Sequence, residues 1–162
     1  LINECLQNTQ AEVEQFNGAH VLISWRQESA KDEVLKVVRS ILARAQYLFE
    51  TDFDASLSDH DVVSKPLPEL SIAMGIDYGE ALSGSLGTVS RKVYTLLGNV
   101  VRRVLLIQSM TQDLYLPVLV SAQASQFMSS GGSLVSQGKF ILPESSEEVE
   151  LLALKEFFEE TE

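Results

Sequence analysis

Two stretches of the chain place apolar side chains at helical spacing. The first covers residues 1–15 and predicts an amphipathic helix that ends at Asn17-Gly18. The second covers residues 29–48, where Ser29 and Asp32 have the spacing of a capping box and the apolar face continues for several turns. The repeating positions are Ile2, Cys5, Leu6, Thr9, Val13 and Phe16 in the first stretch, and Val34, Val37, Val38, Ile41, Leu42, Ala45 and Leu48 in the second. We therefore predict a helix in each.

Short runs rich in β-branched and aromatic residues predict the strands. They cover residues 19–26, 70–77, 80–87, 92–97, 116–120, 134–140 and 149–154. Tyr78-Gly79 separates the second run from the third and predicts a hairpin turn between them. Residues 51–68 lose the apolar pattern to Asp, Ser, His and Pro, which predicts an exposed loop, and a short helix is expected near residues 122–128. This order of elements implies an α+β or α/β fold with a largely antiparallel sheet.

The segment after Gly98-Asn99 predicts a helix that is apolar nearly all round. Its apolar residues are Val100, Val101, Val104, Leu105, Leu106 and Ile107. These side chains cannot all face one sheet, so we expect the helix to be covered on both sides. The second cover would be another subunit or another domain.

Composition limits the size and the partners of the molecule. The 162 residues, 45% of them hydrophobic, suffice for one compact domain over residues 1–162. The net charge of −11 repels nucleic acid and anionic lipid, so we expect no nucleic-acid partner. Eight glutamates lie between Glu144 and Glu162, and we interpret the end of the chain, residues 156–162, as an acidic solubilising tail.

Cysteine use and hydropathy indicate the compartment. Cys5 is the only cysteine, which excludes an internal disulfide and fits a reducing environment. No apolar run approaches the ~20 residues that span a bilayer, and no signal-peptide pattern opens the chain, so we expect no membrane insertion. Because the sequence begins at Leu1 rather than Met, we expect a piece of a longer protein, located in the cytoplasm as its intracellular part.

Three segments of the chain resemble the class III adenylate and guanylate cyclases. Ser71-Ile72-Ala73-Met74-Gly75-Ile76-Asp77-Tyr78-Gly79-Glu80-Ala81-Leu82-Ser83-Gly84-Ser85-Leu86-Gly87 is similar to their hairpin signature of Gly-Ile, a turn Gly and Gly-x-x-Gly. Tyr94-Thr95-Leu96-Leu97-Gly98-Asn99-Val100-Val101 resembles their Tyr-Thr-Val-Ile-Gly-Asp-x-Val. Gln15-Phe16-Asn17-Gly18-Ala19 looks like their Lys-Phe-Ile-Gly-Asp. The three segments keep the family's order and cover most of the chain.

The resemblance implies a fold, a partner and a chemistry. The fold is a ferredoxin-like βαββαβ domain with a mostly antiparallel sheet flanked by helices, and its first strand is missing from this chain. The partner is a second copy or a second cyclase domain, paired head to tail through the helix of residues 100–107. The chemistry is attack of a ribose hydroxyl on the α-phosphate of ATP or GTP, with two Mg or Mn ions held by aspartates.

Several residues of the family's site are replaced here. The second metal aspartate falls on Ala19, and the Asn and Arg of the interface helix fall on Arg102 and Leu106, so we predict no metal site and no catalytic residue of the chain's own. Gln15 stands in place of the base-reading Lys, whereas Thr95 keeps a base-reading identity. Lys139 falls near the family's phosphate-binding Lys, so Gln15, Thr95 and Lys139 are the candidate nucleotide-binding residues.

Other interpretations of these residues are open. Thr95 is also explained by strand packing, and Arg102 and Arg103 at a helix start either meet phosphate or lie on the surface. Asp52 to His60 mimics a calcium loop, but Leu57 and Val63 replace its Gly and its bidentate Glu, which favours a solvated loop.

The residues and the resemblance together lead to three hypotheses about function. We predict a degenerate cyclase homology domain, a pseudocyclase, that dimerises and regulates a cyclic-nucleotide signalling protein. The competing hypotheses are an adenylate or guanylate cyclase, alone or as one half of a heterodimeric site, and a sensor that binds nucleotide without turnover.

Overall fold

The computed structural model describes residues 1–56, 72–129 and 132–158. Its centre is a four-stranded sheet in the order β3 (Met74–Ile76), β6 (Val118–Ser121), β8 (Glu148–Leu154), β7 (Leu134–Ile141). Only the β3–β6 pair is parallel in this sheet. Two hairpins stand apart from it, β1 (Glu12–Asn17) with β2 (His20–Ser24), and β4 (Leu82–Thr88) with β5 (Arg91–Leu97). The predicted α+β fold with mostly antiparallel pairing is confirmed.

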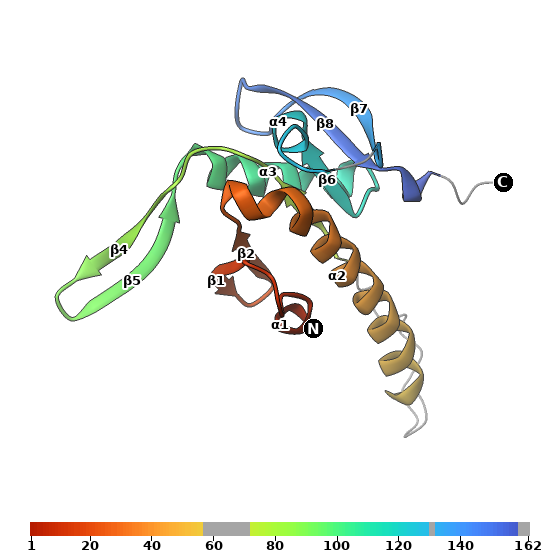
Figure 1. The fold of residues 1–162 in the computed structure, drawn as a ribbon, viewed down its shortest axis with the longest axis horizontal. Coiled ribbons are helices and arrows are strands. Elements are labelled where there is room, and N and C mark those ends of the chain that lie inside the picture. Colours follow the sequence, from red (N-terminus) through yellow and green to blue (C-terminus); the bar gives the residue numbers. More distant parts are fainter. Residues whose placement is uncertain (57–71, 130–131, 159–162) are drawn as a thin grey trace.

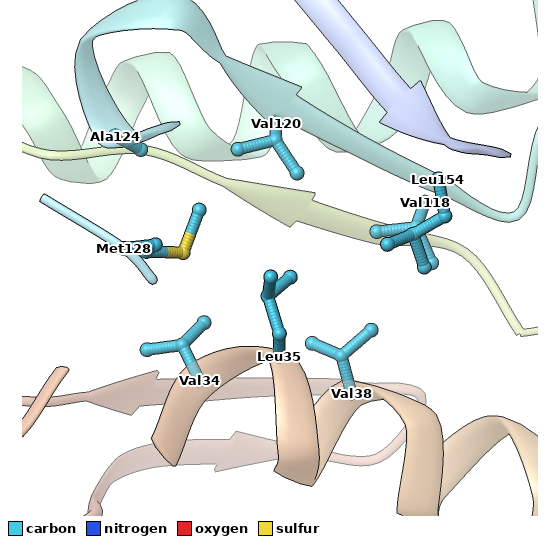
Figure 2. Packing of buried hydrophobic residues seen from close by; sticks show 8 residues of the cluster. All are labelled: Val34, Leu35, Val38, Val118, Val120, Ala124, Met128 and Leu154. Carbon is cyan, nitrogen blue, oxygen red and sulfur yellow. The ribbon is translucent and has the colours of Figure 1, made fainter. Parts of the chain in front are cut away.

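Two long helices cover opposite faces of the four-stranded sheet (Figure 1). Helix α2 (Gln27–Ser56) packs Val34, Leu35 and Val38 on one face, where they meet Val118 and Val120 of β6, as Figure 2 shows. Helix α3 (Asn99–Asp113) packs Ile107 and Met110 on the other face, against Leu119, Leu142, Val149, Leu151 and Ala153. The alternation of Val118, Leu119 and Val120 along one strand divides them between the two cores, as strand geometry requires. Burial on both faces makes β6 the best-protected strand.

The first helix is shorter than the sequence predicts. Helix α1 (Ile2–Cys5) ends after one turn, and Asn8 adopts the left-handed conformation (φ +63°) that stops a helix. The residues that continued its apolar pattern form β1, because backbone pairing with β2 outweighs a weakly helical sequence. Gly18, expected to end a helix, instead supplies positive φ (+58°) in the β1–β2 turn.

The second helix is confirmed, with different ends. It begins at Gln27, so Ser29 lies inside its first turn and donates its hydroxyl to the Arg26 carbonyl at 3.1 Å rather than forming a capping box. It continues to Ser56, which corrects the start of the loop expected over residues 51–68. The rest of that loop lies outside the described residues.

The predicted hairpin between residues 70–77 and 80–87 is wrong. Strand β3 pairs with β6, and β4 pairs with β5 through the turn at Val89-Ser90. Gly79 lets the chain pass close to α3, since a Cβ there would lie 3.0 Å from that of Val100. Gly79 therefore marks a close approach of the chain to α3 and not a hairpin turn.

The later elements follow the sequence closely. Strands β5, β6, β7 and β8 and helix α3 form where they were expected. Helix α4 (Ala122–Ser125) is shorter than expected and is capped by the Ser121 hydroxyl, which accepts from the Ala124 amide at 3.0 Å. The described part of the acidic tail begins in a short 3-10 helix (Lys155–Phe157), and Glu156 forms an ion pair with Arg39 of α2 at 2.6 Å.

Candidate functional site

Two of the predicted nucleotide-binding residues meet at the base of the second hairpin. The side-chain amide of Gln15, on β1, donates to the hydroxyl oxygen of Thr95, on β5, at 2.5 Å. Thr95 is 8% exposed and Gln15 is exposed, so one side of this polar pair is open to solvent. The pair offers amide and hydroxyl groups as donors and acceptors, which are the groups that read the edge of a nucleobase.

The third candidate lies elsewhere in the chain. Lys139 is on β7 at the far edge of the four-stranded sheet, and its ammonium donates to Glu148 at 3.0 Å. The hydrogen bond to Glu148 raises the pKa of Lys139. Both side chains are exposed, so this ion pair contributes little to stability. Within one chain, the structure brings Gln15 and Thr95 together and leaves Lys139 apart.

The three positions at which the resemblance predicts replaced catalytic residues lie in different surroundings. Ala19 lies in the β1–β2 turn and offers no ligand oxygen. Arg102 is exposed on α3 and donates to the backbone carbonyl of Glu144 at 3.1 Å. Leu106 is half-buried and packs against the apolar core beneath α3.

The position that the resemblance gives to the second metal aspartate is Ala19, which has no side-chain ligand. In residues 1–56, 72–129 and 132–158, no group of three or more His, Cys, Asp or Glu side chains lies where it could hold an ion.

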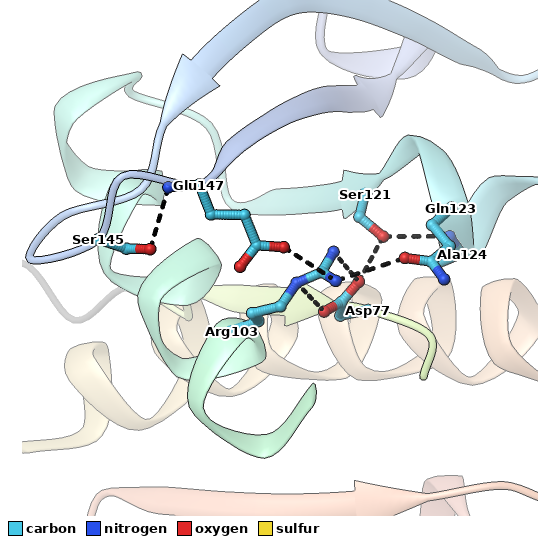
Figure 3. A network of polar contacts seen from close by, with 7 residues as sticks. All are labelled: Asp77, Arg103, Ser121, Gln123, Ala124, Ser145 and Glu147. Carbon is cyan, nitrogen blue, oxygen red and sulfur yellow. Dashed lines mark hydrogen bonds and ion pairs between the residues drawn. The ribbon is translucent and has the colours of Figure 1, made fainter. Parts of the chain in front are cut away.

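A polar network that the sequence did not reveal surrounds Asp77 (Figure 3). Asp77 follows β3 and accepts from the Ser121 hydroxyl at 2.6 Å. Arg103, on α3, forms an ion pair with Asp77 at 3.1 Å and another with Glu147 at 3.2 Å. Its guanidinium also donates to the side-chain oxygen of Gln123 at 3.4 Å. The network thus joins β3, α3, α4 and the loop before β8.

Burial sets the direction of the pKa shift of Asp77 in this network. The Asp77 side chain is fully buried and that of Arg103 is 14% exposed. Burial raises the pKa of Asp77, although the Ser121 hydrogen bond, the Tyr78 amide and Arg103 each oppose that rise. The interpretation that Arg103 lies on the surface is therefore wrong, whereas the same interpretation is correct for Arg102. A signal did exist, because an Asp directly after an apolar strand needs a partner when it is buried.

An open pocket of about 200 Å³ borders the network. Its lining includes Arg103 and Gln123 together with Glu147, Glu148 and Glu150. Three carboxylates beside one guanidinium make this pocket unsuited to phosphate, because the net local charge is negative.

Solved structures of similar fold cover nearly the whole chain. Two structures of a bacterial light-regulated adenylyl cyclase match with TM-scores of 0.70 and 0.74 at 16% identity, over 96% of this chain and 41% of theirs. The adenylyl cyclase CyaB from P. aeruginosa matches with a TM-score of 0.72 at 16% identity, over 94% of this chain and 76% of that one. The guanylyl cyclase Cya2 matches with a TM-score of 0.71 at 15% identity, over 94% and 74%.

These likenesses show a cyclase-like fold. The chain spans less than half the length of the light-regulated adenylyl cyclase. No family model matches the chain, and the search of curated proteins gave no significant match. Among the described residues, no helix has both the length and the apolar character needed to cross a bilayer.

Proposed function

We propose that this chain is a degenerate cyclase homology domain that pairs with a second cyclase-type domain and makes no cyclic nucleotide of its own. The observation that carries the proposal is a retained fold in which Ala19 and Leu106 stand at the positions of a metal ligand and a charge-stabilising Arg. The fold supports pairing, while these two side chains remove groups that phosphoryl-type chemistry needs.

The size of the loss explains why we expect no turnover. Removal of one group that stabilises transition-state charge costs about 3 kcal/mol, a rate factor of ~100 to ~1,000. Loss of both a metal ligand and the Arg removes two such groups from the same reaction. Arg102 does not replace them, because its guanidinium is engaged by the Glu144 carbonyl on the surface of α3.

Exposed apolar surface supports the pairing role. Leu105 is 50% exposed in the middle of α3, although Val104 and Leu106, which flank it in sequence, are half-buried. The β4–β5 hairpin, which precedes α3 in the chain, adds six more exposed large apolar side chains. Exposed apolar surface of this kind is typical of an interface.

A turnover assay tests the loss of chemistry. We expect no cyclic nucleotide above background when the chain is incubated with Mn²⁺ and either ATP or GTP, at concentrations where sedimentation shows a dimer. An active adenylyl cyclase assayed in parallel is the positive control. Product formation by the dimer, abolished by chelation of the metal, would contradict the proposal and support an enzyme.

A second candidate function is nucleotide binding without turnover. The contact between Gln15 and Thr95 favours it, because the two base-reading positions lie together and are accessible on one side. Titration calorimetry with ATP and GTP tests it. Binding that weakens at least tenfold in Thr95→Val, with unchanged binding in Thr88→Val at the far end of the same hairpin, would support a sensor; no heat with either nucleotide would dismiss it.

A further inference from the structure

One buried carboxylate ties α3 to the rest of the fold (Figure 3). Asp77 follows β3, and its side chain is fully buried beside Arg103 of α3. The same guanidinium lies 3.2 Å from Glu147, in the loop before β8, whose side chain is 36% exposed. Arg103 is thus shared between a carboxylate that is sealed from solvent and one that reaches it.

The groups around Asp77 all offer protons to it. The Ser121 hydroxyl oxygen accepts from the Ala124 amide at 3.0 Å, and its own proton points to Oδ1 of Asp77, 2.6 Å away. The Tyr78 amide also donates to the carboxylate, and a guanidinium nitrogen of Arg103 donates to Oδ1 at 3.3 Å. Because every neighbour is a donor, this arrangement matches the charged form of Asp77 and offers no acceptor to a protonated one.

The second oxygen of the carboxylate is held less completely. Oδ2 lies 3.1 Å from Nε of Arg103, and neither atom has a hydrogen-bond partner among the described residues. A proton taken up by Asp77 therefore attaches to Oδ2. The new O–H then faces the N–H of Arg103, and two donors at this distance oppose each other. Protonation thus removes the charge that holds Arg103 and places a donor against it.

The charges that face Asp77 favour this proton uptake. Burial raises the pKa of Asp77, and the nearby charge of Glu147 raises it further, while Arg103 opposes both. The side chain that faces Asp77 from the end of β6 is Ser121, and the side chain of α4 that contacts Arg103 is Gln123; both are neutral. Asp77 therefore takes up a proton at a higher pH than an exposed aspartate does.

We propose that the pair of Asp77 and Arg103 is an acid-sensitive latch that holds the first half of α3 against the sheet. When Asp77 is protonated, Arg103 keeps only its contacts with Glu147 and Gln123, at the open pocket that these three residues line. On this account the buried ion pair serves less to stabilise the fold than to fix one position of α3. Leu105 lies two residues after Arg103, so the latch also controls the pairing surface, a consequence that rests on the proposed function.

An NMR titration of the wild-type chain tests the latch. We expect the carboxyl carbon of Asp77, the Nε–H of Arg103 and the backbone amides of residues 99–106 to change with one shared midpoint between pH 4 and pH 7. A shared midpoint assigns proton uptake and the movement of α3 to one event. The latch is overturned if the carboxyl titrates while the signals of Arg103 and α3 stay fixed, or if the carboxyl does not titrate in this range.

Two variants identify the titrating group. Asp77→Asn keeps the shape of the side chain but is neutral at every pH, so its Arg103 and α3 signals at pH 7 should match those of the wild type at low pH. Glu147→Gln removes the other carboxylate that contacts Arg103, and the response should persist in it at a lower midpoint. A response that survives in Asp77→Asn and disappears in Glu147→Gln would assign the titration to Glu147 and refute the proposal.

Sedimentation at pH 7 separates the latch from the pairing function. Asp77→Asn should self-associate at least tenfold more weakly than the wild type. Asp113→Asn makes the same change in charge at the exposed end of α3 and should associate as the wild type does. Equal association of Asp77→Asn and the wild type would refute control of pairing by the latch, whereas a wild-type chain that stays monomeric would refute the pairing function and leave the NMR test of the latch in force.

Discussion

At the scale of single residues, α3 approaches β3 so closely that one position admits only glycine. A Cβ on Gly75 would lie 2.6 Å from the Val104 carbonyl oxygen and 2.7 Å from the Gln108 amide nitrogen. Both are backbone atoms of α3, so neither can swing aside. Two residues further, Asp77 reaches the same helix through Arg103. Gly75 and Asp77 together fix where α3 lies on the sheet.

We predict that Gly75→Ala destabilises the protein by about 1–3 kcal/mol or more, because α3 must move to admit one methyl group. Urea denaturation measures the loss. Gly84→Ala is the matched control, since nothing lies within 4 Å of a Cβ at that position. It should change the free energy of unfolding by no more than about 0.5 kcal/mol. Equal effects of the two substitutions would contradict the close crossing.

Arg103 and Arg102 are adjacent but should respond very differently to substitution. Arg103→Met leaves the buried carboxylate of Asp77 without its cation, which costs about 3 kcal/mol. Arg102→Met removes only an exposed contact with the Glu144 carbonyl and should cost about 0.5 kcal/mol or less. Unfolding of the two variants side by side checks the difference, and the reverse order would refute the network.

The raised pKa of Asp77 makes a prediction about pH. Below pH 3.8, which is the usual pKa of an Asp side chain, the Asp77 carboxyl is protonated in both the folded and the unfolded chain. Between 3.8 and the higher folded pKa, the folded chain keeps a proton that the unfolded chain has lost, so the contribution of Asp77 to stability falls as the pH rises through this window. The groups that face it are Ser121, Arg103, Glu147 and the Tyr78 amide.

Unfolding free energies of the wild type and of Asp77→Asn, measured from pH 4 to pH 7, check this sign. The asparagine does not titrate, so the wild type should lose stability relative to the variant as the pH rises. A difference that stays flat or grows in favour of the wild type would show that the folded chain does not hold the proton more tightly.

At the scale of elements, the exposed side of α3 is mixed in character. Arg102, Leu105, Ser109 and Gln112 are exposed along it, and only Leu105 is a large apolar residue. The other apolar residues of α3 are buried or half-buried. The sequence of α3 is apolar nearly all round, but most of these apolar side chains are covered in the fold and the exposed apolar part is small. On the proposed function, Leu105 and the β4–β5 hairpin both contribute to the pairing surface.

We predict that Leu105→Glu weakens self-association at least tenfold without loss of helix, because it places a charge in the pairing surface. Gln112→Glu, two turns further along the same exposed side, introduces the same charge near the end of α3 and should have little effect. Sedimentation of both variants makes the comparison. If Leu105→Glu dimerises as tightly as the wild type, α3 is not part of the interface.

Elements with a strong local signal could be predicted from sequence, and those that depend on distant partners could not. The regular apolar face of residues 34–48 predicted α2, because burial against the sheet reinforces the helical spacing. Strand β1 was missed, since its chance helical spacing gave no indication of pairing with β2. The partner of β3 was also missed, because β6 lies more than forty residues away and parallel pairing leaves no turn signal.

The candidate site also contains residues that the sequence predicts and residues whose contacts depend on distant parts of the chain. The resemblance pointed to Gln15 and Thr95, which lie 80 residues apart in sequence and touch in the structure. Asp77 and Arg103 were not predicted as a pair, because their contact depends on how α3 crosses β3. Residue types alone do not reveal such a crossing.

At the scale of the whole molecule, the fold is cyclase-like, with α2 and α3 on opposite faces of one sheet and the β4–β5 hairpin projecting from it. The positions that the resemblance gives to a metal aspartate and a charge-stabilising Arg carry Ala19 and Leu106. We propose that the chain keeps the pairing function of this fold without its chemistry.

Sedimentation equilibrium of the wild-type chain tests this account most directly. The monomer has a mass of 17.9 kDa, and we predict that the weight-average mass rises to twice that value as the concentration increases. A chain that keeps the monomer mass at every concentration, at low and high salt, would contradict the pairing function.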